Sequence, residues 1–342
     1  PPTRPNGGSI VTILIAGGCG FIGLALSERL LADGAAVVAF DRNPPPAAAA
    51  RRFADLPGTW TAVAGDVRDP DALARACRDH GVRQAFYGAA LTSGADRERD
   101  HPEQVVAVNL LGLINLIQAG RAAGLQRLIN ISSGAVYGPG DHPAYGARID
   151  EGTAPADPNS IYGTTKFASE RITRRLAELS ALDFFSVRLS SIYGPWEVDS
   201  GARDTLSPLM QAALLARRGE TAILPRREAR DWTYSRHIAA ALAALMATAR
   251  RPHDLYHITS GALISTSDFC AHLAQVYPDF SFRLAAPGET ATINLHGDFD
   301  RPPMAGDRLA DTLGWRPPAD SAADFADFTQ WMGDYSDFWP AA

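Results

Sequence analysis

The stretch "AGGCGFIG", residues 16–23, follows a short apolar run and opens an amphipathic segment. Its glycines have the spacing G-x-x-G-x-x-G. Between a strand and a helix, the first glycine permits a tight turn, the second lets the backbone approach a pyrophosphate, and the third lets helix and strand pack closely. Free N–H groups at the helix start would then face the phosphates. This stretch predicts a dinucleotide-binding loop, whose residues are Gly17, Gly20, Phe21, Ile22 and Gly23.

The apolar runs around this loop predict the fold. Expected strands span 10–17, 35–41, 60–67, 84–90, 127–132 and 184–190, and expected helices span 21–33, 70–79, 103–123 and 161–180. Continuous apolar strands that alternate with helices are typical of a parallel sheet covered on both faces. The predicted fold class is α/β, a Rossmann doubly wound parallel sheet with a smaller α+β substrate-binding region at the C-terminal end.

Asp41 ends the second expected strand, 18 residues after Gly23. A carboxylate at this point can accept hydrogen bonds from both hydroxyls of an adenosine ribose and would repel a 2′-phosphate, which favours NAD over NADP. The adjacent Arg42 would suit NADP. Asp66 and Val67 lie at the end of the third expected strand and are predicted to lie beside the adenine, although a plain turn explains "GDVRD" almost as well. The candidate cofactor-binding residues here are Asp41, Arg42, Asp66 and Val67.

The regular alternation of strands and helices loosens after residue 195, where Pro, Gly and Arg cluster. We expect a flexible lead-in over residues 1–9, an NAD-binding Rossmann domain over 10–195 and a mainly substrate-binding region over 196–342. Within that region, residues 231–260 are predicted to form a strand and a helix that return to the Rossmann domain.

The composition limits the classes of protein to which the chain can belong. It has 342 residues, of which 46% are hydrophobic, and a net charge of −6 with scattered basic residues, so no nucleic-acid surface is predicted. Cys19, Cys77 and Cys270 are widely spaced, which fits reduced thiols and neither a disulfide framework nor a zinc cluster. No apolar run approaches the ~20 residues that span a membrane. We expect a cytoplasmic protein that binds no metal and no membrane.

A tyrosine and a lysine stand four residues apart in "SIYGTTKFASERI", residues 160–172. On the expected helix, Tyr162 and Lys166 share a face. A free phenol is too weak an acid to serve as a base at neutral pH, but a neighbouring ammonium stabilises its phenolate form. The pair alone says little about function, and its meaning depends on what the rest of the chain brings to that face.

The motifs also occur together in a fixed order: "AGGCGFIG", Asp41, "GDVRD", "YGAA", "VNLLG", "ISSGAVYG", "YGTTK" and "RLSSIYGP". In this order they resemble the extended short-chain dehydrogenases/reductases, and more narrowly the NAD-dependent epimerase/dehydratase family, which includes UDP-glucose 4-epimerase. The resemblance extends from about residue 11 to "LGW" at 313–315. It implies an NAD-dependent enzyme that acts on a sugar-type substrate.

The resemblance implies roles for the matching residues. Tyr162 matches the family's acid/base, and Lys166 matches the group that also holds the nicotinamide ribose. Ser133 aligns with the residue that hydrogen-bonds the reacting oxygen, with Ser132 as the neighbouring alternative. Ala89, in "YGAA", belongs to the cofactor site. The remaining polar positions are expected to organise backbone or water (Asn109) or to be structural or substrate-lining (Tyr87, Tyr137, Tyr193).

The residues after Ser133 bear on the reaction. Family dehydratases have Asp-Glu directly after the active-site Ser/Thr, whereas this chain has Gly134 and Ala135, which disfavours dehydration. We therefore expect a sugar epimerase that oxidises a carbinol transiently. The alternatives are a dehydrogenase of a sugar or sugar acid, a non-catalytic NAD(P)-binding regulator and an NADP-dependent carbonyl reductase.

The substrate is expected to be an anionic sugar derivative. Arg230, in "ARDWTYSRHIA", matches the family's arginine that contacts a nucleotide diphosphate, and Arg226 and Arg227 would also suit an anion. Ser191 stands where the family usually has Asn, and no arginine directly precedes "GD" at 297–298. We expect a nucleotide sugar, with a free sugar or sugar acid as the alternative. The candidate substrate-binding residues are Ser133, Ser191 and Arg230.

Two expected helices, 103–123 and 161–178, have apolar residues on more than one face, which exceeds what contact with one sheet requires. The surplus predicts that they pair across a two-fold axis in a homodimer, as in the family it resembles. A helix buried within a monomer is the alternative.

Overall fold

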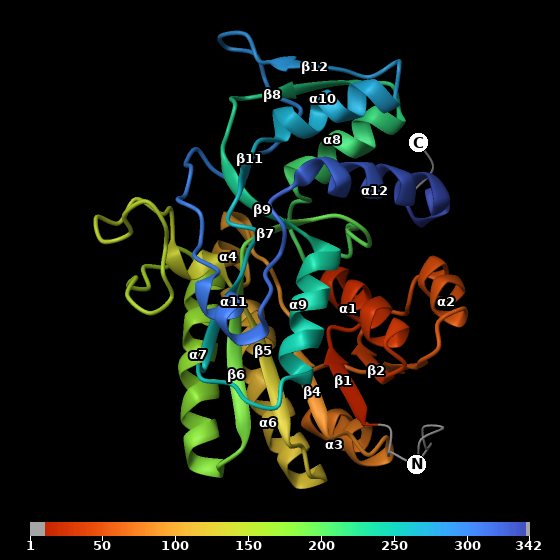
Figure 1. Cartoon of the computed structure of the whole chain (residues 1–342), viewed down its shortest axis with the longest axis vertical. Coiled ribbons are helices and arrows are strands. Elements are labelled where there is room, and N and C mark those ends of the chain that lie inside the picture. The colour runs from red at the N-terminus through yellow and green to blue at the C-terminus, as the bar shows by residue number, and fades with distance from the viewer. Residues whose placement is uncertain (1–10, 340–342) are drawn as a thin grey trace.

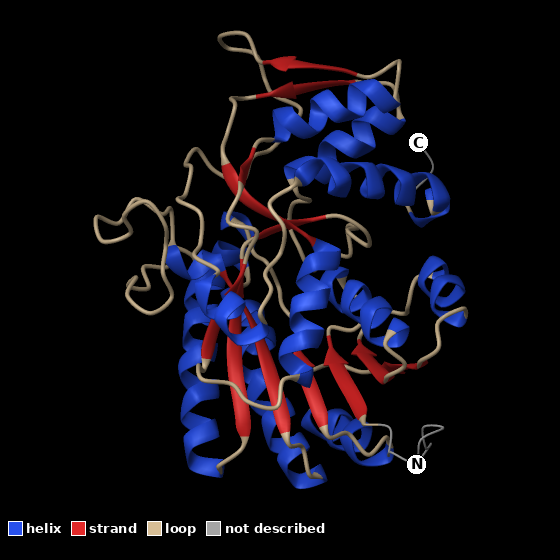
Figure 2. Cartoon of the chain, viewed as in Figure 1, coloured by secondary structure: helices blue, strands red, loops and turns tan. Residues whose placement is uncertain are grey.

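The computed structural model describes residues 11–339, and the expected lead-in over 1–9 lies outside the described residues. Seven parallel strands form one sheet with helices on both faces (Figures 1 and 2). The chain begins in the middle of this sheet and extends toward both edges, which confirms the predicted doubly wound fold. Across the sheet the strands are β10 (Leu255–Ile258), β6 (Asp183–Leu189), β5 (Arg127–Ser133), β4 (Gln84–Tyr87), β1 (Thr12–Ala16), β2 (Ala36–Asp41) and β3 (Thr59–Ala64).

The apolar residues of the sheet supply two cores, one on each face. Successive side chains of a strand point to opposite faces, so Ile13 and Ile15 of β1 enter one core while Leu14 enters the other. The first core lies under α1 (Phe21–Ala32), α2 (Ala47–Ala54) and α9 (Ser235–Ala247). The second lies under α3 (Pro70–Asp79), α6 (Gly112–Ala123) and α7 (Ile161–Ser180).

Two elements differ from the sequence prediction. The third strand was expected to be buried, but β3 is an edge strand paired only with β2, and none of its six residues is buried. The expected helix over 103–123 is divided into α5 (Pro102–Val106), a π-helical turn (Ala107–Leu111) and α6. Turns of this kind often occur at functional positions, because they redirect side chains within a helix.

The C-terminal region is built from two small sheets and several helices, seen at the top of Figure 1. A three-stranded sheet contains β7 (Ser191–Tyr193), β9 (Arg230–Tyr234) and β11 (Leu263–Ile264), and β8 (Thr221–Leu224) pairs with β12 (Ser281–Leu284). After β9 the chain returns to the large sheet, because α9 packs against α1 and β10 pairs with β6. The helices of this region are α8 (Pro208–Arg217), α10 (Thr266–Val276), α11 (Asp307–Leu313) and α12 (Ser321–Asp334). The short helix α4 (Ala95–Asp100) belongs to the first half of the chain, between β4 and α5.

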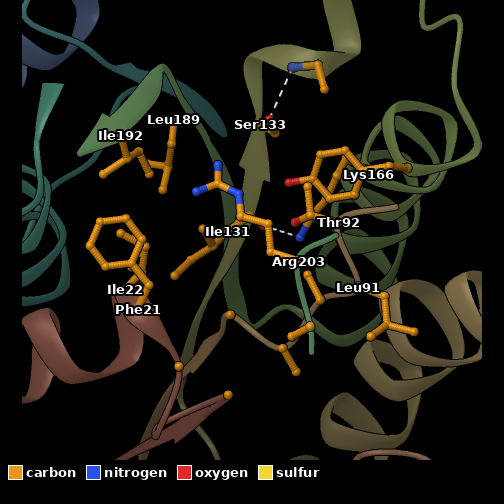
Figure 3. A pocket seen from close by; sticks show the side chains of 18 of the residues that line it. Phe21, Ile22, Leu91, Thr92, Ile131, Ser133, Lys166, Leu189, Ile192 and Arg203 are labelled. Carbon is orange, nitrogen blue, oxygen red and sulfur yellow. Dashed lines mark hydrogen bonds between the residues drawn. The ribbon is translucent and has the colours of Figure 1, made fainter. Parts of the chain in front are cut away.

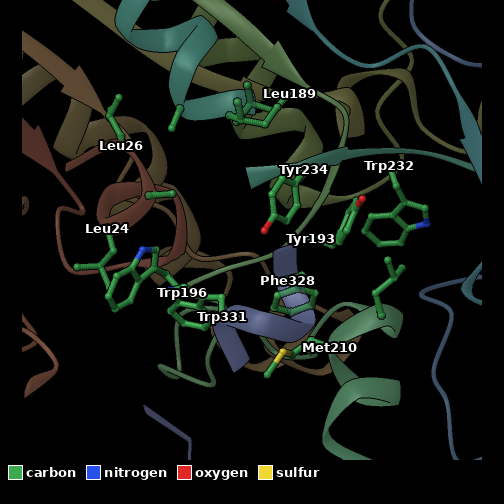
Figure 4. Close-up of a cluster of buried hydrophobic side chains, with 14 of the residues drawn as sticks. Leu24, Leu26, Leu189, Tyr193, Trp196, Met210, Trp232, Tyr234, Phe328 and Trp331 are labelled. Atoms are coloured by element: carbon green, nitrogen blue, oxygen red, sulfur yellow. The ribbon is translucent and has the colours of Figure 1, made fainter. Parts of the chain in front are cut away.

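An aromatic cluster joins the C-terminal region to the Rossmann fold (Figure 4). The rings of Trp196 and Trp331, the latter on α12, have centroids 5.0 Å apart. The indole N–H of Trp196 donates to Glu28 of α1 over 2.8 Å. Because these residues and Leu24 of α1 belong to one continuous core, the C-terminal region is held against the cofactor-binding half of the sheet.

One helical segment could cross a membrane by length and composition. Residues Pro102–Ala123 have a mean hydropathy of 1.5 over an 18-residue window, although the sequence analysis expected no such run. Half of that window is buried inside the protein, where α6 packs against α3. This burial is typical of a core helix.

Candidate active site

A pocket of about 400 Å³ opens at the carboxyl ends of the parallel strands, where open α/β sheets bind ligands (Figure 3). Residues from the loops after β1, β4 and β5, from α7 and from the C-terminal region line it. Every residue predicted for the cofactor, catalytic and substrate sites lies in its wall: Gly17, Gly20, Phe21, Ile22, Gly23, Asp41, Arg42, Asp66, Val67, Ala89, Ser133, Tyr162, Lys166, Ser191 and Arg230.

The glycine loop forms a tight cradle on one side of the pocket. Gly17 has φ of +80°, and a Cβ there would lie 2.7 Å from the backbone nitrogen of Ala89. A Cβ on Gly23 would lie 2.1 Å from the carbonyl oxygen of Gly17. Helix α1 then begins at Phe21 without a side-chain cap, which leaves N–H groups of its first turn for a ligand.

Asp41 lies beside this cradle at the end of β2. Its Oδ2 accepts a hydrogen bond from the Cys19 N–H over 3.0 Å, and its Oδ1 accepts one from the Asn43 N–H over 2.9 Å. These two bonds fix the carboxylate against the loop, while each oxygen keeps acceptor capacity for a ribose hydroxyl. Arg42 is exposed at the same rim.

The glycine cradle, the uncapped helix start and Asp41 together fit NAD. The helix start faces the position of the pyrophosphate, and the carboxylate stands where the adenosine ribose would be held. Asp66 forms an ion pair of 2.5 Å with Arg68, which lowers the pKa of the Asp66 carboxyl. At this end of the pocket Asp66 is therefore already paired, and Asp41 is the better acceptor for the cofactor.

The catalytic candidates lie at the end of β5 and on the first turns of α7. Lys166 is buried, and its Nζ donates to the carbonyl oxygen of Ile131 over 2.8 Å. Burial lowers the pKa of the Lys166 ammonium. The same Nζ lies 5.8 Å from the ring centroid of Tyr162. Ser133 caps the short 3₁₀ helix Gly134–Tyr137, its Oγ accepting from the Ala135 N–H over 3.1 Å (Figure 3).

Ser132 and Ser133 have different surroundings, because neighbours on a strand point to opposite sides. The Ser132 hydroxyl donates to Glu170 over 2.5 Å and is buried behind the catalytic face. Glu170 forms a bidentate ion pair with Arg188 of β6, at 2.6 Å between Oε2 and Nη2. Arg188 also donates to the Tyr137 hydroxyl. We call Ser132, Glu170, Arg188 and Tyr137 the buried network; the sequence analysis did not identify Glu170 or Arg188, although Glu170 stands four residues after Lys166.

Asn109 lies on the π-helical turn and connects two walls of the pocket. Its side chain exchanges hydrogen bonds with the backbone N–H and carbonyl of Leu91, which follows β4. It also donates to the hydroxyl of Thr165, next to Lys166. Asn109 therefore organises backbone beyond its own helix, while the hydroxyl of Tyr87 bonds to Val108 and Tyr193 is fully buried.

The expected cluster of arginines is only partly present. Arg226 pairs with Asp300 at 2.9 Å and Arg227 pairs with Asp268 at 2.7 Å, and neither lines the pocket. The prediction that they would serve an anion together with Arg230 was wrong, because exposed carboxylates of the protein pair with them: Asp300 in a loop and Asp268 on the first turn of α10. Arg230, the first residue of β9, does line the pocket, and its Nη2 is buried without a hydrogen-bond partner among the described residues.

Two further pocket residues, His296 and Arg301, come from the segment around "GD" at 297–298. His296 occupies the place where the family arginine is missing, and burial lowers its pKa to about 4. A neutral imidazole there supplies no positive charge at neutral pH. Arg301, five residues later, reaches the pocket instead. Arg301 follows "GD" at 297–298 in the sequence, whereas the family pattern predicts an arginine before it.

Residues 11–339 contain no group of three or more His, Cys, Asp or Glu side chains placed to hold a metal ion. The three cysteines are free and buried at separate places.

Comparisons with known proteins show which family the chain belongs to. The NAD dependent epimerase/dehydratase family matches residues 13–258. The chain is 28% identical to UDP-glucose 4-epimerase of Mycolicibacterium smegmatis over 89% of this chain and 93% of that protein. It is 33% identical to 3 beta-hydroxysteroid dehydrogenase/Delta 5→4-isomerase of Mycobacterium tuberculosis over 53% of this chain and 47% of that protein.

A similar fold is found in UDP-glucose 4-epimerase from Bifidobacterium longum, solved in complex with NAD⁺ and UDP. Its TM-score is 0.79 at 19% identity, over 96% of this chain and all of that one. Since the family match covers most of the chain and the glycine cradle, Asp41, Tyr162 and Lys166 line one pocket, this protein belongs to the NAD-dependent epimerase/dehydratase family, whose enzymes use NAD.

Proposed function

We propose that the protein is an NAD-dependent nucleotide-sugar epimerase that oxidises a carbinol transiently. The observation that supports this most is the convergence on one pocket of a dinucleotide cradle, the Ser133–Tyr162–Lys166 set and the unpaired Arg230. When bound, NAD would supply a reversible hydride acceptor for the carbinol carbon, and the glycine loop, Asp41 and Lys166 are the residues that would hold it.

The protein's own residues manage the proton and the geometry. Tyr162 takes the proton of the sugar hydroxyl, and the Lys166 ammonium stabilises the phenolate that acts as base. Ser133 hydrogen-bonds the same sugar oxygen. Because Lys166 is held by the carbonyl of Ile131 on β5, its charge stays at a constant position beside the reacting oxygen.

Small residues beside the catalytic serine distinguish this reaction from dehydration. Elimination of water needs an additional acid and base, whereas Gly134 and Ala135 offer neither. A dehydrogenase that releases NADH each turnover is the competing reaction, and the same three catalytic residues would serve it.

Product analysis with excess NAD separates these two reactions. UDP-glucose and UDP-glucuronic acid are incubated with the enzyme while absorbance of reduced nicotinamide is followed and sugar epimers are separated by chromatography. We expect an epimer without net NADH. Stoichiometric NADH with an oxidised sugar would identify a dehydrogenase and reject the proposal.

The cofactor preference follows from Asp41. We expect NAD to bind at least tenfold more tightly than NADP, a difference of about 1.4 kcal/mol, because the carboxylate repels a 2′-phosphate. Fluorescence titration of both cofactors measures this ratio. Asp41→Asn should reduce the ratio of NAD affinity to NADP affinity. Asp66→Asn should leave this ratio unchanged, because it removes a carboxylate that is already paired with Arg68. Equal affinities in the unmodified protein would contradict the assignment.

We also propose that the enzyme is a homodimer built on α5, α6 and α7. Two large apolar side chains remain exposed before α6: Val106, the last residue of α5, is 37% exposed, and Leu111, in the π-helical turn, is 51% exposed. Light scattering at micromolar concentration should give twice the 36.5 kDa mass of the chain. Leu111→Glu should give monomers, whereas Leu284→Glu, at an equally exposed position on β12, should not. A monomeric wild-type protein would refute this arrangement.

A further inference from the structure

Two arginines in the pocket wall have no acidic partner. Arg230 and Arg301 lie near the same aromatic ring, with guanidinium carbons 5.8 and 5.7 Å from the ring centroid of Phe299. Unlike Arg226 and Arg227, neither forms an ion pair with a carboxylate within residues 11–339. Removing an unpaired charge from water is costly. Two neighbouring cations at the pocket therefore favour a ligand with negative charge at more than one position.

Arg301 is held in a cradle of glycines that follows the catalytic serine. Its Nη1 donates to the carbonyl oxygen of Gly134 over 3.0 Å, and its Nη2 donates to that of Gly138. A Cβ on Gly140 would lie 2.3 Å from Cγ of Arg301. A Cβ on Gly134 would lie 3.4 Å from Nη1. The absence of a side chain at Gly140 makes room for the stem of Arg301. The neutral carbonyls of Gly134 and Gly138 orient the guanidinium without cancelling its charge.

This cradle places Arg301 next to the reaction centre. Lys166 donates to the carbonyl of Ile131 and Arg301 donates to that of Gly134, so the two cations bind the chain on either side of Ser133. Arg230 comes from the separate three-stranded sheet. A sugar whose carbinol is held by Ser133 and Tyr162 thus has Arg301 beside its ring.

A buried carboxylate of the protein also faces this pocket. Asp231 lines the wall, and its Oδ2 accepts hydrogen bonds from the Thr259 hydroxyl and the Met304 N–H. Burial raises the pKa of Asp231 to about 6, so the carboxyl is still largely ionised at neutral pH. Glu228 and Asp300 favour the charged form of Arg230, whereas the Arg301 guanidinium donates to carbonyl oxygens and forms no ion pair with a carboxylate among the described residues.

We propose that Arg301 recognises a carboxylate on the sugar ring itself, so that the preferred substrate is a nucleotide-linked hexuronic acid. Arg230 then serves the diphosphate. This inference rests on the proposed function, because it takes Ser133 and Tyr162 as the site of the reacting carbinol. Arginine suits the task, since its planar fork matches a carboxylate and its charge persists when it is buried.

Binding measurements with three related probes test this assignment. UDP-glucuronic acid, UDP-glucose and UDP are titrated by calorimetry into NAD-saturated wild type, Arg301→Gln, Arg301→Lys and Arg230→Gln. The wild type should bind UDP-glucuronic acid at least tenfold more tightly than UDP-glucose. Arg301→Gln should reduce this preference to about twofold or less and leave UDP affinity within about threefold of wild type. Arg301→Lys should keep part of the preference, because it keeps the charge.

The Arg230 variant is the matched control. Arg230→Gln should weaken all three probes by a similar factor, since all three contain the diphosphate. Equal wild-type affinities for the two sugars would overturn the inference. So would an Arg301→Gln variant that weakens UDP as much as UDP-glucuronic acid, because Arg301 would then serve the diphosphate or only the loop.

Failure of the nucleotide-sugar proposal can be recognised separately. If none of the UDP probes binds the wild type, the substrate is not a UDP-sugar, and the same proteins are titrated with galacturonic acid and galactose. A preference for the acid that is lost in Arg301→Gln would support the role of Arg301. Equal binding of acid and neutral sugar, or binding of neither, would reject it.

Discussion

Replacing Tyr162 with phenylalanine is expected to lower the turnover number about 10²–10⁴-fold, the usual contribution of a positioned acid/base. The phenyl ring keeps its place on α7 beside Lys166, but no oxygen remains to take the proton of the sugar hydroxyl. The affinity for NAD should stay within a few-fold of wild type, because the glycine loop and Asp41 bind the other end of the cofactor. Turnover and cofactor titration of the same preparation measure both effects.

A second tyrosine provides the control for this substitution. Tyr193 is fully buried, its hydroxyl has no hydrogen-bond partner among the described residues, and it lies outside the pocket wall. Tyr193→Phe should therefore leave turnover and stability nearly unchanged. A Tyr162→Phe enzyme with near-normal turnover would show that another group is the base.

The second large effect is expected on stability. Glu170→Gln should lower the free energy of unfolding by about 3–5 kcal/mol, the usual cost of breaking a buried ion pair. The substitution leaves Arg188 buried, with 5% of its side chain exposed and its main counter-charge gone. It also weakens the bond to the Ser132 hydroxyl, which ties β5 to α7. Urea denaturation followed by circular dichroism gives the change in free energy.

The same helix offers a matched comparison. Glu178 pairs with Arg175 at 3.0 Å, but both side chains are more than half exposed. Glu178→Gln should change the free energy of unfolding by less than about 1 kcal/mol, because solvent screens exposed ion pairs. If the two variants lose equal stability, the buried network does not hold the catalytic face together.

The sequence by itself determined the fold class and most of the candidate cofactor site. Hydrophobic periodicity and glycine spacing are local properties, and they act through backbone geometry that depends on nearby residues. The loop from Gly17 to Gly23 and the acid at the end of the second strand were therefore identified from their spacing alone. Tyr162 and Lys166 share a helix face because they are four residues apart, but their catalytic role was predicted from the resemblance carried by the whole set of motifs.

Tertiary structure decided what depends on contacts between distant segments. It gave the neighbours Ser132 and Ser133, which both border the pocket, different partners: the Ser132 hydroxyl is buried and bonds to Glu170, whereas the Ser133 hydroxyl caps the turn after β5. It also exposed β3, because no strand follows it at the sheet edge.

The arginines show most clearly that contacts between distant segments cannot be predicted from local sequence. Arg226 and Arg227 are neutralised by Asp300 and Asp268, whereas Arg301 meets the carbonyl of Gly134, 167 residues earlier in the chain. No local pattern encodes such pairings. Charge in a sequence shows that a cation exists, but only the packing of loops around the sheet decides whether a carboxylate of the protein neutralises it or the pocket leaves it for a ligand.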